Sequence, residues 1–171
     1  VRGALRSDIV LHVDASQSPL FESLERTKWG AGLVSLDAQK VGGVRGMGCL
    51  VVSAVPLVSI WHGGGQERGF RSGTPSPALA AAFATALEEC AAAREAFVSR
   101  ASGMRARLVE RIRENLPWVE VNEGRKNAPH ILNLSFAGID TDYLQALLDK
   151  EGFGVATKSA CETDSPQGSR A

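Results

Sequence analysis

The sequence predicts an α/β protein, and two observations carry this expectation. Short runs rich in β-branched residues occupy the first third of the 171-residue chain and return after Pro117, which is typical of strands. Between them lies one long stretch in which apolar residues recur every three or four positions, the period of a helix face. The order of elements therefore indicates two α/β pieces joined by a single helix.

The first piece, placed at residues 1–76, is expected to be rich in strands. The expected strands cover residues 9–13, 32–36, 49–53 and 56–61. The first is followed by Asp14, and the second leads into Asp37 and a glycine-rich loop. A second loop, residues 62–69, contains four glycines, which disfavour any regular element there.

A long connecting helix is expected over residues 77–116. Ser76 followed by Pro77 is a favourable helix start, because serine caps the first turn and proline fits its first position. Pro117 ends the pattern, so the helix would be roughly 50 Å long. Residues 117–171 then form the second piece, with strands at 118–121 and 130–136 and a short helix capped by Asp140.

Composition and charge exclude several classes of protein. Lysine plus arginine and aspartate plus glutamate both number 19, so the net charge is +0 and a sequence-independent nucleic-acid binder is disfavoured. No run approaches the about 18 to 20 apolar residues of a membrane span, and the N-terminus has no signal-peptide pattern. We therefore expect a cytoplasmic protein. Because the chain begins with Val1, we also expect it to be a piece of something longer.

The three cysteines differ in their surroundings. An odd count without metal-like spacing argues against a disulfide framework and favours a reducing compartment. Cys49 and Cys90 lie in apolar patterns and are expected to be small buried side chains. Cys161 lies in a small, polar, loop-like setting beside Lys158, and is a candidate reactive thiol.

Four features could carry chemistry together, one of them the nucleophile Cys161. Asp14 follows a strand, with Gln17 three residues on, and Lys40 lies just past the next strand. Residues 68–74 offer cations, a hydroxyl and backbone amides to an anion. A lysine for a Schiff base, an aspartate for a ring nitrogen and polar groups for a phosphate are the components of a pyridoxal 5'-phosphate (PLP) site. Each of them taken singly also has an ordinary structural interpretation.

Several motifs, in order, resemble those of the cysteine desulfurases in the class V aminotransferase family. The matching segments are His12-Val13-Asp14-Ala15-Ser16-Gln17, Lys40 with Gly43 and Gly46, residues 63–74, residues 129–133, and Ser159-Ala160-Cys161. The resemblance implies part of a PLP fold-type I transferase: the second half of the large-domain sheet, a connecting helix and a small C-terminal domain. It also implies conversion of L-cysteine to L-alanine, with the sulfur passed to an acceptor protein for iron–sulfur cluster assembly or tRNA thiolation.

The resemblance assigns a role to individual residues. Lys40 matches the lysine bonded to PLP, Asp14 the partner of the ring nitrogen, and Gln17 the contact to the ring hydroxyl. Thr74 matches a phosphate contact that reaches the neighbouring subunit's cofactor, which implies a homodimer. Cys161 matches the cysteine that takes the sulfur as a persulfide.

Two positions depart from the resemblance. The family usually has Ser-x-His-Lys at the lysine, where its serine and histidine help to hold the cofactor, whereas this chain has Asp37-Ala38-Gln39-Lys40. Gln39 can still donate a hydrogen bond, but it carries no charge. A carboxylate at Asp37 would repel a phosphate unless a cation such as Arg45 intervened. We interpret the pair as the mark of a divergent subgroup that keeps the site.

The resemblance also implies that the 171 residues hold about half of an active site. The family's ring-stacking histidine and substrate-side asparagine would precede Val1, and its carboxylate-binding arginine would follow Ala171. These residues alone are therefore expected to show little activity. Two alternatives stay open: another class V enzyme, such as one similar to a selenocysteine lyase, and a non-catalytic scaffold related to the family.

Overall fold

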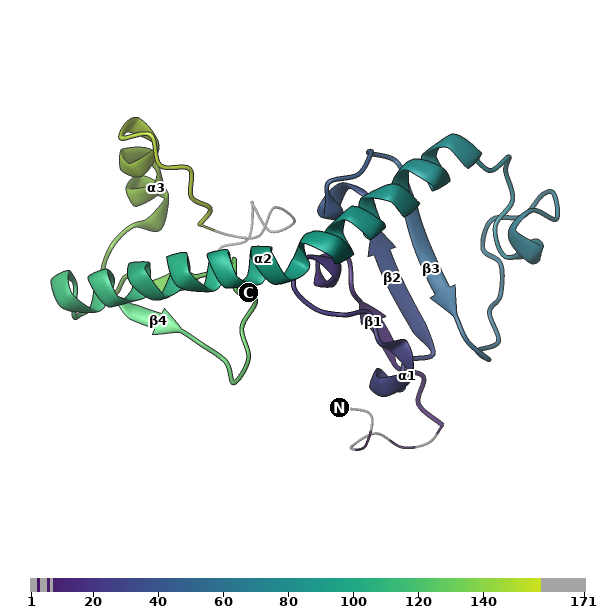
Figure 1. Cartoon of the computed structure of the whole chain (residues 1–171), viewed down its shortest axis with the longest axis horizontal. Coiled ribbons are helices and arrows are strands. Elements are labelled where there is room, and N and C mark those ends of the chain that lie inside the picture. Colours follow the sequence, from purple (N-terminus) through teal and green to yellow (C-terminus); the bar gives the residue numbers. More distant parts are fainter. Residues whose placement is uncertain (1–2, 4–5, 7, 158–171) are drawn as a thin grey trace. The chain divides into compact units, whose positions relative to one another are not determined.

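The computed structural model describes residue 3, residue 6 and residues 8–157, in two compact units (Figure 1). The first unit is Val1–Ser99 and the second is Arg100–Ala171. One helix, α2 (Pro77–Asn115), contributes residues to both. It confirms the helix predicted over 77–116, and its start is capped as expected, since the Leu79 amide donates to Ser76 Oγ at 3.5 Å.

The first unit contains a three-stranded mixed sheet in the order β1-β2-β3. Strand β1 (His12–Asp14) runs parallel to β2 (Leu33–Asp37), and β2 runs antiparallel to β3 (Gly48–Val52). The register places Asp14 opposite Ser35 and Asp37 opposite Gly48. The carboxyl ends of β1 and β2 therefore share one edge of the sheet.

The core of this unit lies between the sheet and the first half of α2, which passes over the strands in Figure 1. Alternate residues of β2, Val34 and Leu36, are buried, as expected for a strand with one face against a core. Phe83 of α2 is only 4% exposed and belongs to the same cluster. Cys90 packs against it half-buried, which agrees with its predicted apolar role.

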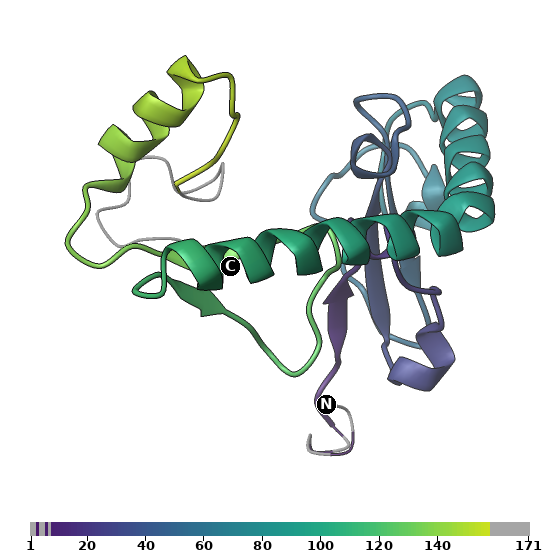
Figure 2. The same ribbon diagram turned by 60° about the vertical axis from the view of Figure 1, so that its left-hand side comes forward.

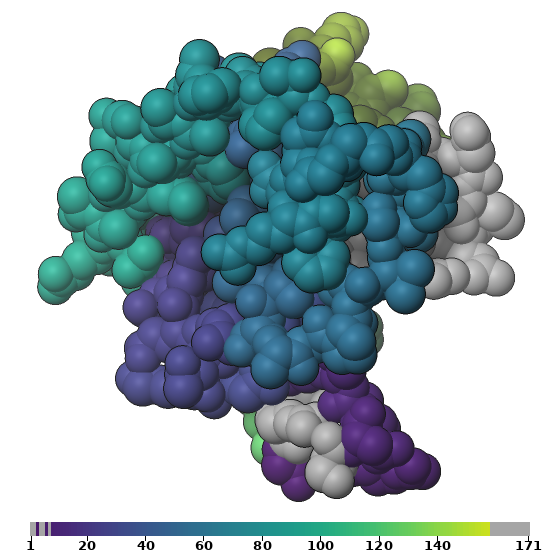
Figure 3. Space-filling view, turned by 90° about the vertical axis from the view of Figure 1, so that its right-hand side faces the viewer, coloured from purple at the N-terminus to yellow at the C-terminus, as the bar shows by residue number. Residues whose placement is uncertain are grey.

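The strand predicted at 56–61 is wrong. Val58, Ile60 and Trp61 are 88%, 80% and 66% exposed, in an irregular segment at the surface of the first unit (Figure 3). Ala54 has a left-handed φ of 50°, which turns the chain away after β3. β-branched residues favour a strand only where another strand offers backbone groups to pair with, and this turn removes the segment from β2.

Two further expectations about the sheet also need correction. Strand β1 begins at His12 rather than Ile9, because its ladder with β2 starts at the His12–Leu33 pair. Cys49 is exposed, although its apolar neighbours predicted burial. It lies in β3, where four of the five residues are exposed because α2 leaves that strand largely uncovered.

The second unit pairs β4 (Glu120–Asn122) with β5 (Asn133–Ser135) in an antiparallel ladder and adds α3 (Thr141–Lys150). Both strands are shorter than the ranges predicted at 118–121 and 130–136, since the ladder has three residue pairs. The cap predicted at Asp140 is confirmed: its side chain accepts from the amides of Asp142 and Tyr143. Across residues 3, 6 and 8–157, no helix is long and apolar enough to cross a membrane.

Two glycines on different parts of the fold should respond oppositely to alanine. A Cβ at Gly43 would lie 2.9 Å from the Ala38 carbonyl oxygen and 3.1 Å from the Ala86 Cβ. Overpacking against backbone costs about 1–3 kcal/mol, so we expect Gly43→Ala to lower the free energy of unfolding by that amount. Gly103, within α2, has nothing within 4 Å, so Gly103→Ala should raise it by about 1 kcal/mol. Urea denaturation measures both, and equal effects would contradict the packing described for Gly43.

Candidate functional site

Asp14 is exposed at the end of β1 and finds its partner in the adjoining turn. Its Oδ1 accepts hydrogen bonds from Ser16 Oγ at 2.6 Å and from the Ser16 amide at 3.0 Å. These two bonds, hydroxyl first, lower the pKa of the Asp14 carboxyl; burial opposes them slightly, and nearby His12 adds to the lowering. The carboxylate therefore stays ionised mainly through the two Ser16 bonds.

Lys40 is exposed on a short 3₁₀ turn, Gln39–Val41, that follows β2. The turn is closed by two bonds to the Ala38 carbonyl, from the Val41 amide at 3.2 Å and from the Gly43 amide at 2.8 Å. Gly42 completes it with a left-handed φ of 80°, which favours glycine. The backbone that carries Lys40 is thus held by its own hydrogen bonds and by the buried Ala38.

Asp37 contributes to the same turn. Its Oδ1 accepts from the Gln39 amide at 2.9 Å, so the carboxylate caps the turn rather than standing free beside it. Gln39 itself is exposed. Parallel pairing of β1 and β2 brings Asp14 and the Asp37–Lys40 segment to one edge of the sheet.

Gln17 lies three residues after Asp14, at the start of a second 3₁₀ turn, Ser18–Leu20. Pro19 in this turn is fully buried, and its carbonyl accepts from Arg94 Nε of α2 at 3.0 Å. The turn is therefore pinned to the helix. Sequence reasoning missed Arg94, because nothing local links it to Pro19; it also missed Ser16, although an Asp followed two residues later by Ser is a known turn signal.

Thr74 stands on a separate loop, and it is exposed just before α2. The loop is organised by its own bonds: Ser72 Oγ donates to the His62 carbonyl at 3.2 Å, and the Gly73 amide donates to Gln66 Oε1 at 3.3 Å. The structure thus gathers Asp14, Gln17, Asp37, Gln39 and Lys40 at the ends of β1 and β2, and it carries Thr74 on the loop after β3.

Cys161 lies outside the described residues, which end at Thr157. The two described thiols are not activated. Partial loss of water around its sulfur raises the pKa of Cys49, with the carboxylate of Glu67 adding to it. Partial burial also raises the pKa of Cys90, although Arg94 opposes it. Since a nucleophilic thiol needs a lowered pKa or a nearby base, neither of these two cysteines replaces Cys161 as a candidate.

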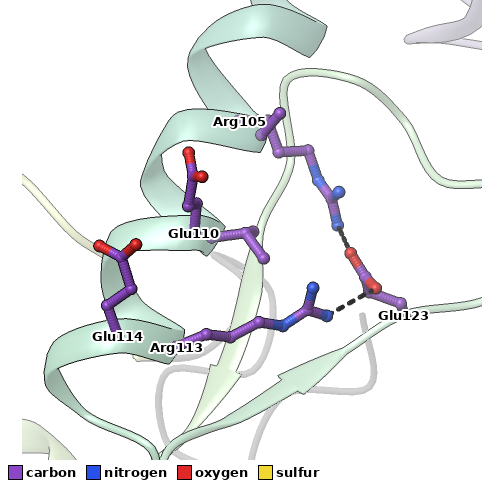
Figure 4. Close-up of a pocket in the computed structure, with 7 residues that line it drawn as sticks. Arg105, Glu110, Arg113, Glu114 and Glu123 are labelled. Carbon is purple, nitrogen blue, oxygen red and sulfur yellow. Dashed lines mark hydrogen bonds and ion pairs between the residues drawn. The ribbon is translucent and has the colours of Figure 1, made fainter.

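The second unit has an open hollow of about 670 Å³ along α2, and five of the residues that line it are charged (Figure 4). Glu123 there accepts from Arg105 at 2.9 Å and from Arg113 at 3.5 Å. Arg105 also donates from Nε to the Ile131 carbonyl at 3.2 Å, so it ties α2 to the segments beside β4 and β5. Both arginines are engaged with Glu123, which makes the hollow a structural ion-pair cluster.

Comparison with known proteins identifies the family. The family model described as Aminotransferase class-V matches residues 1–169. A mitochondrial cysteine desulfurase of Arabidopsis thaliana is 34% identical over 163 residues, which is 92% of this chain and 35% of that protein. Cysteine desulfurase IscS of Vibrio vulnificus is 33% identical over 161 residues, 92% of this chain and 39% of that protein.

Among solved structures, one described as a NifS-like protein superposes with a TM-score of 0.78 at 29% identity. The match covers 86% of this chain and 40% of that structure. The architecture is therefore part of the PLP fold-type I arrangement, as the sequence predicted. The chain belongs to the class V aminotransferase family, and it spans about 40% of the length of the relatives it matches.

The bonds from Ser16 to Asp14 should make the stability of the protein depend on pH. Replacing Ser16 with alanine removes the hydroxyl donor, so the pKa of Asp14 should rise toward its ordinary value of 3.8. A carboxyl whose pKa is lower in the folded than in the unfolded protein stabilises the fold. This stabilisation is complete at pH values above the unfolded pKa, and it is lost as the pH falls through the folded pKa. Ser16→Ala should therefore destabilise the protein most near neutral pH, and the difference from wild type should shrink in acid.

Carboxyl NMR titration measures the Asp14 pKa, and denaturation at several pH values measures the stability difference. Ser18→Ala, which removes a hydroxyl from the neighbouring turn, is the matched control and should leave the Asp14 titration unchanged. An Asp14 titration in Ser16→Ala that matches wild type would show that the Ser16 bonds do not set this pKa.

Proposed function

We propose that this chain carries part of the active site of a PLP-dependent cysteine desulfurase, an enzyme that converts L-cysteine to L-alanine. The observation that carries the proposal is the parallel pairing of β1 with β2, which brings an ionised Asp14 and the Lys40 turn to one edge of the sheet. Ligands bind outside the carboxyl ends of strands in α/β sheets of this kind. The names of the relatives support the same activity.

The side chains at this edge fit PLP in their chemistry. Asp14 is kept ionised by Ser16, so it can hold a proton at the ring nitrogen, and Gln17 in the adjoining turn can contact the ring hydroxyl. Lys40 is exposed on a rigid turn and can bond the cofactor through Nζ. When bound, PLP supplies the electron sink that stabilises negative charge at the substrate Cα.

The phosphate would be held by groups from two loops. We assign contacts to Gln39, whose exposed amide can donate, and to Thr74, which in the proposed homodimer serves the neighbouring subunit's site. Asp37 contributes through its bond to the Gln39 amide, since that bond fixes the turn on which Gln39 and Lys40 stand.

Cys161 is proposed as the sulfur acceptor within the enzyme. Its thiolate attacks the sulfur of bound L-cysteine, a new S–S bond forms and the substrate Cβ–S bond breaks. The electron pair of the broken bond stays with the carbon skeleton, which takes up a proton and leaves as L-alanine. The persulfide on Cys161 then passes to an acceptor protein of iron–sulfur cluster assembly or tRNA thiolation, and we place this chemistry in the cytoplasm.

The proposal includes a domain organisation. Residues 1–76 supply part of the large cofactor domain, 77–116 the connecting helix, and 117–171 part of the small domain with the Cys161 segment. The rest of the site would come from further sequence of a longer enzyme, as the 40% coverage of the NifS-like structure suggests.

The lysine assignment is tested by trapping the cofactor. Borohydride reduction of the complete, PLP-loaded enzyme should add the mass of reduced PLP to the peptide containing Lys40. We expect Lys40→Ala to lose this label entirely, whereas Lys28→Ala, a control at another exposed lysine, should keep it. A label that persists in Lys40→Ala would contradict the assignment, and a complete protein that binds no PLP would favour the scaffold alternative.

The cysteine assignment is tested by following the sulfur. With ³⁵S-labelled L-cysteine, Cys161→Ser should lose protein-bound sulfur, and its L-alanine production should fall by about two orders of magnitude or more, in the range typical of losing a catalytic group. Cys49→Ser removes an exposed thiol of the first unit and should behave as wild type. Full L-alanine production by Cys161→Ser would instead favour an enzyme similar to a selenocysteine lyase.

A further inference from the structure

The chain that leaves α3 doubles back along the helix before it reaches residue 158 (Figures 1 and 2). The reversal occurs at Gly152, whose φ is 84°, and the Phe153 amide bonds back to the Leu148 carbonyl at 2.8 Å. Residues 153–157 then run beside α3 toward its first turns. Thr157, the last described residue, therefore lies next to side chains from the start of the helix.

Three polar contacts hold this returning segment. Gln145 Nε2 donates to the Val155 carbonyl at 3.0 Å. Thr157 Oγ1 donates to Asp142 Oδ1 at 3.0 Å, with Gln145 Oε1 as a second acceptor at 3.4 Å. A hydroxyl has one proton, so the carboxylate is the main acceptor and the bond is charge-assisted.

Apolar burial contributes little to this attachment. Phe153 and Val155 are 63% and 45% exposed, so the segment is not held by packing of its large side chains. Thr157 is half-buried, and it is the residue at which the two polar side chains of α3 converge. The attachment therefore depends mainly on hydrogen bonds from Asp142 and Gln145, two residues on adjacent turns of one helix.

We propose that Asp142, Gln145 and Thr157 are positioning residues that fix the point from which the Cys161 segment departs. This inference rests on the function proposed for Cys161. Four residues separate Thr157 from Cys161, so their Cα atoms can be at most about 14 Å apart, whatever conformation lies between them. If the Thr157 bonds are lost, the last residue held on α3 is Val155, through its bond from Gln145. The Cα atoms of Val155 and Cys161 can be at most about 21 Å apart.

The position of Cys161 is measured by electron spin resonance distances in the complete protein. Cys49→Ser and Cys90→Ser remove the other thiols of this chain. Spin labels go on Cys161 and on Tyr143→Cys, a position near the start of α3 whose side chain is 64% exposed. In Thr157→Val, which keeps the shape but loses the hydroxyl, we expect the longest distances to grow by about 7 Å, because Val155 is no nearer to Tyr143 than Thr157 is. Thr157→Ser should restore the original distribution, and Thr141→Val, a matched change at the exposed start of α3, should leave it unchanged.

A catalytic readout separates positioning from simple stability. The volume in which the Cys161 Cα must lie is bounded by the cube of the limiting distance, which rises from about 14 Å to about 21 Å. The effective concentration of the thiol at the substrate sulfur falls by the same factor, so Thr157→Val should lower kcat for L-alanine roughly threefold with KM for L-cysteine unchanged. Asp142→Ala should do the same, while Thr157→Ser and Asp142→Asn, which keep a donor or an acceptor, should recover the rate. PLP content and thermal melting should match wild type in all four variants.

Different results would contradict the attachment of Thr157, its role in positioning Cys161, and the proposed desulfurase function. Unchanged distances in Thr157→Val would overturn the attachment, and changed distances with an unchanged kcat would overturn its role in positioning. A complete protein that binds no PLP would overturn the proposed desulfurase function, while the distance measurement would still decide whether Thr157 holds the segment.

Discussion

The parallel pairing of β1 with β2 is the constraint on which the candidate site depends. Only three residue pairs form this ladder, yet they decide that Asp14 and the end of β2 meet at the same edge of the sheet. The Ala15 amide extends the pairing by donating to the Ser35 carbonyl at 2.9 Å, so the turn that carries Ser16 and Gln17 starts from a fixed point. A one-residue slip of β2 would expose Val34 and Leu36 and shift the end of β2 relative to Asp14, so burial of β2 also protects the site.

Small residues then fix the lysine turn against α2. Ala38 is fully buried, and Gly43 lies so close to the Ala38 carbonyl and the Ala86 side chain that a larger residue would force them to shift. The same helix holds the Gln17 turn through the bond from Arg94 to the Pro19 carbonyl. Both turns that carry proposed cofactor ligands therefore depend on α2, and rigid support of this kind is what a binding constellation needs.

Signals that act over a few residues could be predicted from the sequence, whereas contacts between elements could not. The start of α2 at Ser76-Pro77 and the cap at Asp140 depend on local chemistry, and the structure contains both. The segment 56–61 has strand-forming residues but no pairing there, and strand propensity alone does not reveal whether a partner is available. The bond from Thr157 to Asp142 depends on how far the chain returns along α3, which no spacing rule contains.

The least expected residue of the site, Asp37, is explained by what aspartate and serine have in common. Both side chains can accept a hydrogen bond from the backbone amide two residues later, and Asp37 does so with Gln39. An aspartate in place of the serine that the resemblance implies therefore preserves the turn that carries Lys40. The serine hydroxyl could also donate to a phosphate, and the carboxylate cannot. In the proposed enzyme, phosphate binding must then depend more on Gln39, on Thr74 and on cations such as Arg45, while the lysine and the partner of the ring nitrogen keep their positions.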